Sequence, residues 1–220
     1  MTMNNFTLTF LRHGESLGNL KGFYQGGRDF PLTPRGMDQV RRLISRWQLD
    51  GTRFDRVITS PLKRAFDTAE MIGEAFKCRV EVDSAWQERN MGQLTGITRY
   101  EAIKKKKKPE FFTPYNNIGE TGEGDWALYL RAGRAIQAIL DRPPARYLIV
   151  SHGGILNQAL HVIFGMTPQA NGQGTHFRFV NTAFSTIHYA PAQHKWVVWG
   201  LNDFTHLAVK DFDLEDVEES

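Results

Sequence analysis

The sequence has little cysteine and no long hydrophobic run, and each shortage excludes a class of protein. Cys78 is the only cysteine among 220 residues, so the chain cannot form an internal disulfide and fits a reducing compartment. No apolar stretch approaches the roughly 20 residues that span a bilayer. The first residues also lack the basic region and long apolar segment of a signal peptide. We therefore expect a cytoplasmic protein without a membrane partner.

Acidic residues are scarce relative to basic ones until the end of the chain. The formal net charge is +3, but the last ten residues, DFDLEDVEES, contain six acidic residues and no basic one. The preceding body keeps all 27 basic residues and 18 of the 24 acidic ones, a formal charge of +9. A basic body favours an anionic ligand. We expect residues 1–210 to form a single domain and residues 211–220 a flexible, solvated tail.

A run of five lysines at residues 104–108 raises the question of nucleic-acid binding. No recognised nucleic-acid motif or series of stacking aromatic residues accompanies the run. Pro109 follows it directly, and proline cannot continue a helix. We therefore interpret the run as the solvated end of a helix and expect no nucleic acid among the partners.

Short apolar runs alternate with amphipathic stretches, a pattern that predicts strands followed by helices. Strands are expected at residues 7–11, 56–60, 79–83 and 147–151. Two pairs, Thr33–Pro34 and Ser60–Pro61, combine a capping hydroxyl with proline at the first helical position. Apolar residues then recur at helical steps, and those expected on the buried faces are Met37, Val40, Ile44, Trp47, Ala65, Ala69, Ile72 and Phe76.

The second half of the chain contains an irregular segment before the regular pattern returns. Residues 84–125 lose the periodicity, and we expect them to form an insertion over one end of the sheet. A helix is expected from about residue 126 until Pro143, and a second one over GGILNQALHVIF until Gly165. The residues expected to face inward on the first are Leu128, Ala132, Ile136 and Ile139. The runs HFRFV, AFSTIHYA and WVVWGL are expected to be antiparallel strands.

These elements predict an α/β fold. We expect a three-layer sandwich with a mostly parallel central sheet that carries antiparallel strands, and with helices on both faces. In such a sheet the ligand binds beyond the carboxyl ends of the strands. Arg12 and His13 directly follow the first strand, and His152 follows the strand at residues 147–151. Because Arg64 lies in the first turn after the second strand, we expect all four side chains to meet in one crevice.

Two arginines and two histidines around one point favour binding of a dianion. A guanidinium group stays charged and offers a planar fork of donors to phosphate or carboxylate oxygens. The helices expected to start at Pro61 and Gly153 add the positive ends of their dipoles. A phosphoryl group fits best, because its transfer depends on positioning and charge stabilisation.

The order Arg–His–Gly favours His13 as a nucleophile. Its imidazole must be neutral, with one ring nitrogen facing the phosphorus atom. Gly14 lets the backbone turn tightly, so that a main-chain carbonyl can hold the other ring N–H and fix the tautomer. The flanking arginines disfavour protonation of the imidazole.

Four motifs occur along the chain: LRHGE at residues 11–15, SPLKRA at 60–65, WQERNMG at 86–92 and SHGG at 151–154. In this order and spacing they resemble the motifs of the histidine phosphatase superfamily, also called the phosphoglycerate mutase-like fold. The resemblance extends over most of the chain.

The resemblance implies a role for each matching residue. His13 would become transiently phosphorylated, and Arg12, Arg64 and His152 would bind the phosphoryl oxygens. Glu88 would protonate the leaving oxygen and then deprotonate the attacking water. Three further residues match phosphate-contacting or pocket-lining positions of the family: Asn19, Gln25 and Gly26. No metal and no cofactor are implied, because arginines neutralise the charge.

Structural interpretations compete with these roles. A lone Arg–His pair after a strand is often a surface turn, and His152 alone could be a buried structural histidine. Glu88 could simply pair with its neighbour Arg89. The remaining histidines lack metal-ligand spacing, and Ser151 lacks the first glycine of a hydrolase nucleophile elbow.

The preferred activity is that of a metal-independent phosphomonoester phosphatase acting on a small phosphorylated metabolite. Mutases of the family typically carry Glu-Arg-His-Tyr-Gly, whereas residues 88–92 read ERNMG, so that Met91 replaces the tyrosine. The alternatives are a cofactor-dependent phosphoglycerate mutase-type phosphotransferase and a non-enzymatic module that binds phosphoanions. The sequence leaves open which metabolite is the substrate and whether the chain forms a homodimer.

Overall fold

The central element of the fold is a six-stranded mixed sheet. The computed structural model describes residues 4–105 and 111–207. Its strands are β1 (Phe6–Arg12), β2 (Arg56–Thr59), β3 (Val80–Val82), β4 (Arg146–Ser151), β5 (Phe184–Ala190) and β6 (Lys195–Asp203). Their order across the sheet is β3-β2-β4-β1-β5-β6. The pairs of β1 with β4 and of β2 with β3 and β4 are parallel, whereas β5 is antiparallel to both β1 and β6.

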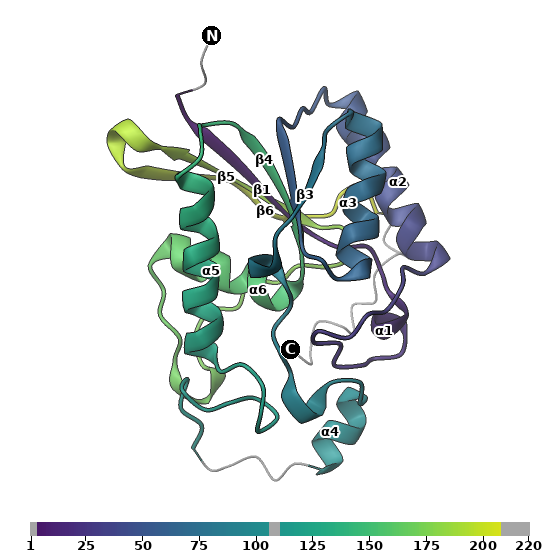
Figure 1. Cartoon of the computed structure of the whole chain (residues 1–220), viewed down its shortest axis with the longest axis vertical. Helices are drawn as coiled ribbons and strands as arrows, with labels where there is room; N and C mark the ends of the chain where they lie inside the picture. Colours follow the sequence, from purple (N-terminus) through teal and green to yellow (C-terminus); the bar gives the residue numbers. More distant parts are fainter. Residues whose placement is uncertain (1–3, 106–110, 208–220) are drawn as a thin grey trace.

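Helices cover both faces of this sheet (Figure 1). The helices are α1 (Leu17–Leu20), α2 (Pro34–Leu49), α3 (Lys63–Phe76), α4 (Arg99–Lys105), α5 (Asp125–Leu140) and α6 (Gly153–Phe164). One buried apolar cluster joins α2 and α3 to the sheet, and a second, larger cluster joins α5 and α6 to it. The predicted three-layer α/β sandwich, with a mostly parallel sheet and antiparallel strands, is therefore confirmed.

The predicted start of α2 is confirmed, but its buried face is rotated from the predicted one. The Thr33 hydroxyl caps the helix by accepting from the N–H of Gly36, and Pro34 takes the first position. Met37 is exposed, whereas Gly36 and Leu43 are buried. The reason lies at Gly36, where an added Cβ would lie 2.1 Å from the carbonyl oxygen of Glu15. This close backbone contact fixes which side of α2 faces the sheet.

The predicted start of the next helix is wrong. Helix α3 begins at Lys63, not at Pro61, and its cap residue Leu62 makes no side-chain hydrogen bond. The Ser60 hydroxyl accepts from the N–H of Leu62 at 3.2 Å and lies 2.8 Å from Nε2 of His152. Ser60 therefore serves a tertiary contact across the sheet rather than a helix cap.

The predicted strand at HFRFV, residues 176–180, is also wrong. This segment is irregular, and β5 begins only at Phe184. The amides of Phe177 and Val180 donate to the side-chain oxygens of Asn157 and Asn202, not to backbone carbonyls of a neighbouring strand. Phe179 is buried in the apolar cluster under α5 and α6, so the alternation reflects core packing without strand pairing.

The segment predicted to be an insertion, residues 84–125, lies on the side of the sheet where β1 and β4 end (Figure 1). It contains α4 and short turns, and Phe23 and Thr98 form an antiparallel bridge that joins it to the loop after α1.

The lysine run begins at the end of α4, but most of it lies outside the described residues, as does the acidic tail at 211–220. None of the helices within residues 4–105 and 111–207 is long and apolar enough to cross a bilayer.

Candidate active site

The four side chains predicted to converge do meet at the carboxyl ends of the central strands. His13 follows β1 and His152 follows β4, and their rings lie 5.1 Å apart between centroids. Nε of Arg64, in the first turn of α3, lies 3.2 Å from Nε2 of His13. Both histidines and Arg64 are buried, and Arg12 is half-buried beside them. Parallel strands β1 and β4 are neighbours, so the two histidines leave the sheet side by side.

The hydrogen bonds of His13 define which ring nitrogen carries the proton. Nδ1 lies 2.7 Å from the carbonyl oxygen of Gly14, which can only accept, so Nδ1 carries the hydrogen. Nε2 accepts from the guanidinium of Arg64, which can only donate. Nε2 therefore holds the lone pair and is the ring nitrogen that is chemically able to attack an electrophile.

Gly14 is needed for close packing rather than for the tight turn that the sequence suggested. The φ angle of Gly14 is not positive, so residues with a side chain can also adopt its backbone conformation. An added Cβ would instead lie 2.7 Å from the carbonyl oxygen of Gly36 at the start of α2. The N–H of Gly14 donates to the Thr68 hydroxyl at 3.1 Å, and that of Glu15 donates to Gln39 at 2.9 Å. Helices α2 and α3 thus hold the loop that carries His13.

Arg64 is fixed by carbonyl groups rather than by a carboxylate. Its Nη1 donates to the carbonyl oxygen of Arg28 at 2.9 Å, and its Nη2 donates to that of Gly26 at 3.0 Å. The pKa of Arg64 is lowered to about 10, and burial is the main cause. Glu88 and Asp29 oppose the shift, whereas Arg12 adds to it. The guanidinium therefore stays protonated at neutral pH and keeps most of its charge for an anion.

Burial and the surrounding cations keep both histidines neutral. Burial holds the pKa of His13 well below its ordinary value of 6.5, and Arg64 and Arg12 lower it further, while the hydrogen bond to Gly14 opposes the shift. The pKa of His152 is lowered first by burial and then by Arg64 and His13. The arginines act as predicted, but burial is the larger cause.

His152 keeps one ring nitrogen for a ligand. Its Nε2 lies 2.8 Å from the Ser60 hydroxyl. Its Nδ1 is buried and has no hydrogen-bond partner among the residues that the structure describes. A buried polar atom without a partner costs free energy, about 1–3 kcal/mol. A bound phosphate oxygen would supply the missing partner.

Glu88 lies on the rim of this crevice. Its Oε2 accepts from the N–H of Gly154 at 3.3 Å, at the start of α6, and its Oε1 accepts from the amide of Arg89 at 2.8 Å. The Arg89 guanidinium instead pairs with Asp125 at 2.5 Å, so Glu88 is not held in the ion pair that the sequence left open. Among the charged groups that affect the pKa of Arg64, Glu88 raises it most, which places the Glu88 carboxylate near that guanidinium.

The three further predicted residues occupy different places. Oδ1 of Asn19 accepts from the N–H of Ser16, and the Ser16 hydroxyl lies 2.8 Å from it and 2.8 Å from Oε1 of Gln25. The side chains of Asn19 and Gln25 are therefore joined through Ser16 beside the crevice. Gly26 contributes its carbonyl to Arg64 and so orients that guanidinium, and its contact with a substrate stays a prediction.

Sequence reasoning missed Asn181. Its Nδ2 donates to the carbonyl oxygen of His13 at 2.9 Å and lies 3.4 Å from Oδ1 of Asn19. The available signal was an Asn–Thr pair directly before the apolar run that forms β5.

Within residues 4–105 and 111–207, no group of three or more His, Cys, Asp or Glu side chains is arranged to hold a metal ion.

The neutral buried histidines predict a dependence of stability on pH. Below about pH 6.5 His13 and His152 gain protons in the unfolded chain but not in the folded one. The free energy of unfolding should therefore fall as the pH drops from 6.5 to 5.5. His152→Gln should reduce this slope by up to about 1.4 kcal/mol per pH unit, as measured by urea denaturation. The exposed His194, changed to Gln, is the control and should leave the slope unchanged; an equally steep slope in His152→Gln would contradict the assignment.

Comparisons with known proteins find similar chains that are named as phosphatases and as mutases. The sequence of the chain is 32% identical over 198 residues to the uncharacterized phosphatase PhoE of Bacillus subtilis, which covers 90% of this chain and 95% of that protein. It is 34% identical over 170 residues to a 2,3-bisphosphoglycerate-dependent phosphoglycerate mutase of Methylorubrum populi, covering 73% and 80%. The crystal structure of the alpha-ribazole phosphatase from Shigella flexneri superposes with a TM-score of 0.74 at 26% identity, covering 90% and 97%.

The family comparison confirms the resemblance carried by the four motifs. The family described as the histidine phosphatase superfamily (branch 1) matches residues 8–202. This range runs from β1 to β6 and includes both histidines, Arg12, Arg64 and Glu88. The chain belongs to the histidine phosphatase superfamily.

Proposed function

We propose that this protein is a phosphomonoester phosphatase that works through a phosphohistidine on His13. The observation that carries the proposal is the neutral imidazole whose Nε2 lone pair lies among cationic side chains. The carbonyl of Gly14 holds the opposite nitrogen, so the lone pair is directed without help from a carboxylate. Burial and two arginines keep the ring unprotonated at neutral pH.

In the first step the substrate phosphate binds to Arg12, Arg64 and His152. The N–H of Arg64 that faces Nε2 of His13 turns to a phosphate oxygen, which frees the lone pair. Nε2 then attacks phosphorus, the bond from phosphorus to the ester oxygen breaks, and its electron pair stays on that oxygen. The carboxylic acid of Glu88 donates a proton to this leaving oxygen, so the alcohol departs neutral.

In the second step water replaces the alcohol. The carboxylate of Glu88 takes a proton from the water as its oxygen attacks phosphorus. The bond between phosphorus and Nε2 breaks, and its electron pair returns to the ring of His13. Inorganic phosphate leaves, and Glu88 is again protonated for the next cycle.

The crevice supports a small phosphorylated metabolite as the substrate class. The phosphoryl group is surrounded by the buried cations, while the leaving group faces the segment of residues 84–125 and the loop at Gly26. Met91 stands where mutases of the family carry tyrosine, which favours transfer to water over transfer to a second phosphorylated ligand. A mutase-type phosphotransferase is the second candidate, because the relative from Methylorubrum populi is named as a mutase.

We expect His13→Ala to lower the hydrolysis of p-nitrophenyl phosphate by about 10³-fold or more, because the nucleophile is removed. The variant should still bind tungstate in isothermal titration calorimetry, since Arg12, Arg64 and His152 remain. The wild-type activity should be unchanged by a chelator.

Normal hydrolysis by His13→Ala would contradict the mechanism, and no hydrolysis by the wild-type protein would leave a binding module instead. Incubation with 3-phosphoglycerate and catalytic 2,3-bisphosphoglycerate separates the two enzyme activities. We expect release of free phosphate, whereas isomerisation to 2-phosphoglycerate would assign the protein as a mutase.

Glu88→Gln should slow alkyl phosphates more than aryl phosphates. An alkoxide leaves poorly without a proton, whereas p-nitrophenolate leaves readily, so acid catalysis matters most for the alkyl ester. We expect a loss of about 10²-fold or more in kcat/KM for an alkyl phosphate and a clearly smaller loss for p-nitrophenyl phosphate. Equal losses on both substrates would remove Glu88 from this role.

A further inference from the structure

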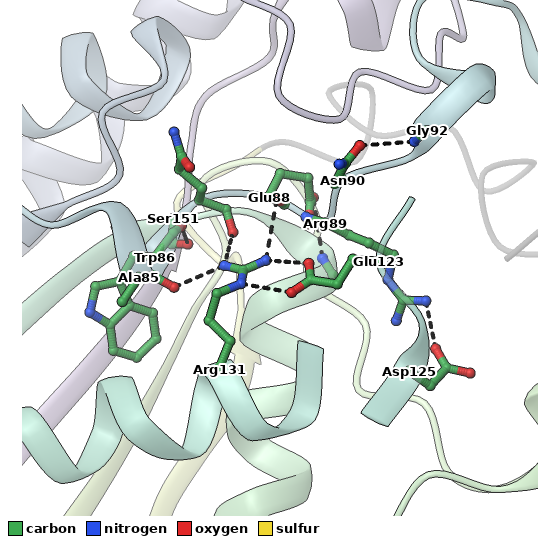
Figure 2. A network of polar contacts seen from close by, with 12 residues as sticks. Ala85, Trp86, Glu88, Arg89, Asn90, Gly92, Glu123, Asp125, Arg131 and Ser151 are labelled. Atoms are coloured by element: carbon green, nitrogen blue, oxygen red, sulfur yellow. Dashed lines mark hydrogen bonds and ion pairs between the residues drawn. The ribbon is translucent and has the colours of Figure 1, made fainter. Parts of the chain in front are cut away.

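Arg131 lies outside the phosphate-binding groups, yet its side chain faces the segment that carries Glu88. It projects from the second turn of α5 toward residues 85–88 (Figure 2). Nη1 donates to the carbonyl oxygens of Ala85 and Gln87 at 2.9 and 2.7 Å. Nη2 lies 3.4 Å from the carbonyl oxygen of Glu88 itself. One guanidinium thus gathers three carbonyls of four consecutive residues.

The fourth carbonyl of this segment, that of Trp86, is held by a different side chain. The Ser151 hydroxyl, at the end of β4 and directly before His152, donates to the carbonyl oxygen of Trp86 at 2.6 Å. Every carbonyl from Ala85 to Glu88 therefore has a side-chain donor. These bonds tie the backbone before Glu88 to α5 and to β4, the strand directly before His152.

Arg131 is itself held in place by Glu123. Nε and Nη2 donate to the two carboxylate oxygens of Glu123 at 2.9 and 2.6 Å, a bidentate pair on the side of the guanidinium away from Ala85 (Figure 2). The two side chains are only 20% and 16% exposed, so the pair is poorly screened by solvent. The amide of Glu123 donates to the carbonyl oxygen of Asn90 at 2.7 Å, which fixes the chain beyond Glu88 as well.

This arrangement leaves the Glu88 carboxyl group on the crevice side of a fixed backbone. The carbonyl of Glu88 faces Arg131, while its carboxylate oxygens accept from the amides of Arg89 and Gly154. Proton transfer requires the carboxyl oxygen to lie within about 3 Å of the leaving oxygen. A misplacement of about 1 Å can cost as much as 10²-fold in rate.

We infer that Arg131, held by Glu123, is a positioning residue that places the Glu88 carboxyl group for proton transfer. The inference rests on the proposed function, because it assigns to Arg131 an effect that acts through Glu88. Lysine cannot replace arginine here, because an ammonium has three donors and no planar fork for carbonyls and a carboxylate together.

The test compares an alkyl phosphate with p-nitrophenyl phosphate in Arg131→Lys. We expect kcat/KM for the alkyl phosphate to fall by about 10- to 100-fold, and that for p-nitrophenyl phosphate by less than about threefold. In a Glu88→Gln background, Arg131→Lys should cause little further loss on the alkyl phosphate, because both changes remove the same proton transfer. Glu123→Gln, which keeps the side-chain shape but loses the charge, should show the same selective loss.

Arg134→Lys is the matched control, since Arg134 is exposed on the same helix and should leave both activities unchanged. Thermal denaturation of each variant verifies that it is folded. Equal losses of Arg131→Lys on both substrates, or a loss that multiplies with that of Glu88→Gln, would overturn the inference while leaving the proposed function intact. A wild-type protein without turnover would overturn the proposed function and this inference with it. Equal losses from Glu88→Gln alone would remove Glu88 from its role and overturn this inference, but would leave hydrolysis through His13 intact.

Discussion

The hydrogen bond from Nδ1 of His13 to the carbonyl oxygen of Gly14 is the interaction on which the site depends. It places the ring proton on the nitrogen that faces the backbone, so the other nitrogen holds a lone pair inside the crevice. This bond by itself favours the protonated ring, and the pKa of His13 is low only because burial and the two arginines outweigh it. The fold supplies both conditions, since α2 and α3 hold the buried loop after β1 and the first turn of α3 places Arg64 beside the ring. A neutral imidazole in a cationic environment follows from this placement.

Cations in a buried site must satisfy their donors without losing their charge, and carbonyl groups serve this purpose. Arg64 is bound by the carbonyls of Gly26 and Arg28, which orient the guanidinium but leave its charge for an anion. A carboxylate in the same place would have neutralised it. Arg131 uses carbonyls in a different way, because Glu123 already balances its charge. There the carbonyl oxygens are the groups that are held, and the guanidinium of Arg131 orients the backbone that carries Glu88.

Local chemistry made much of the fold predictable, whereas long-range contacts did not. The start of α2 at Thr33–Pro34 and the end of α6 at a glycine depend only on residues adjacent in the sequence, and both predictions are confirmed. Ser60 failed as a helix cap because its hydroxyl contacts His152, 92 positions away. The four central cationic and imidazole side chains could be placed together because parallel strands end at one edge of a sheet. Arg131 could not be found in this way, because the carbonyls that it binds lie 43 to 46 positions earlier and leave no side-chain pattern.

The most direct test of the account is to trap the phosphorylated enzyme. The wild-type protein is mixed with a ³²P-labelled aryl phosphate, quenched rapidly without acid, and digested for mass spectrometry of the labelled peptide. The account predicts an acid-labile, base-stable label on the imidazole of His13. Turnover with no label on that ring, or a label on another side chain, would contradict it.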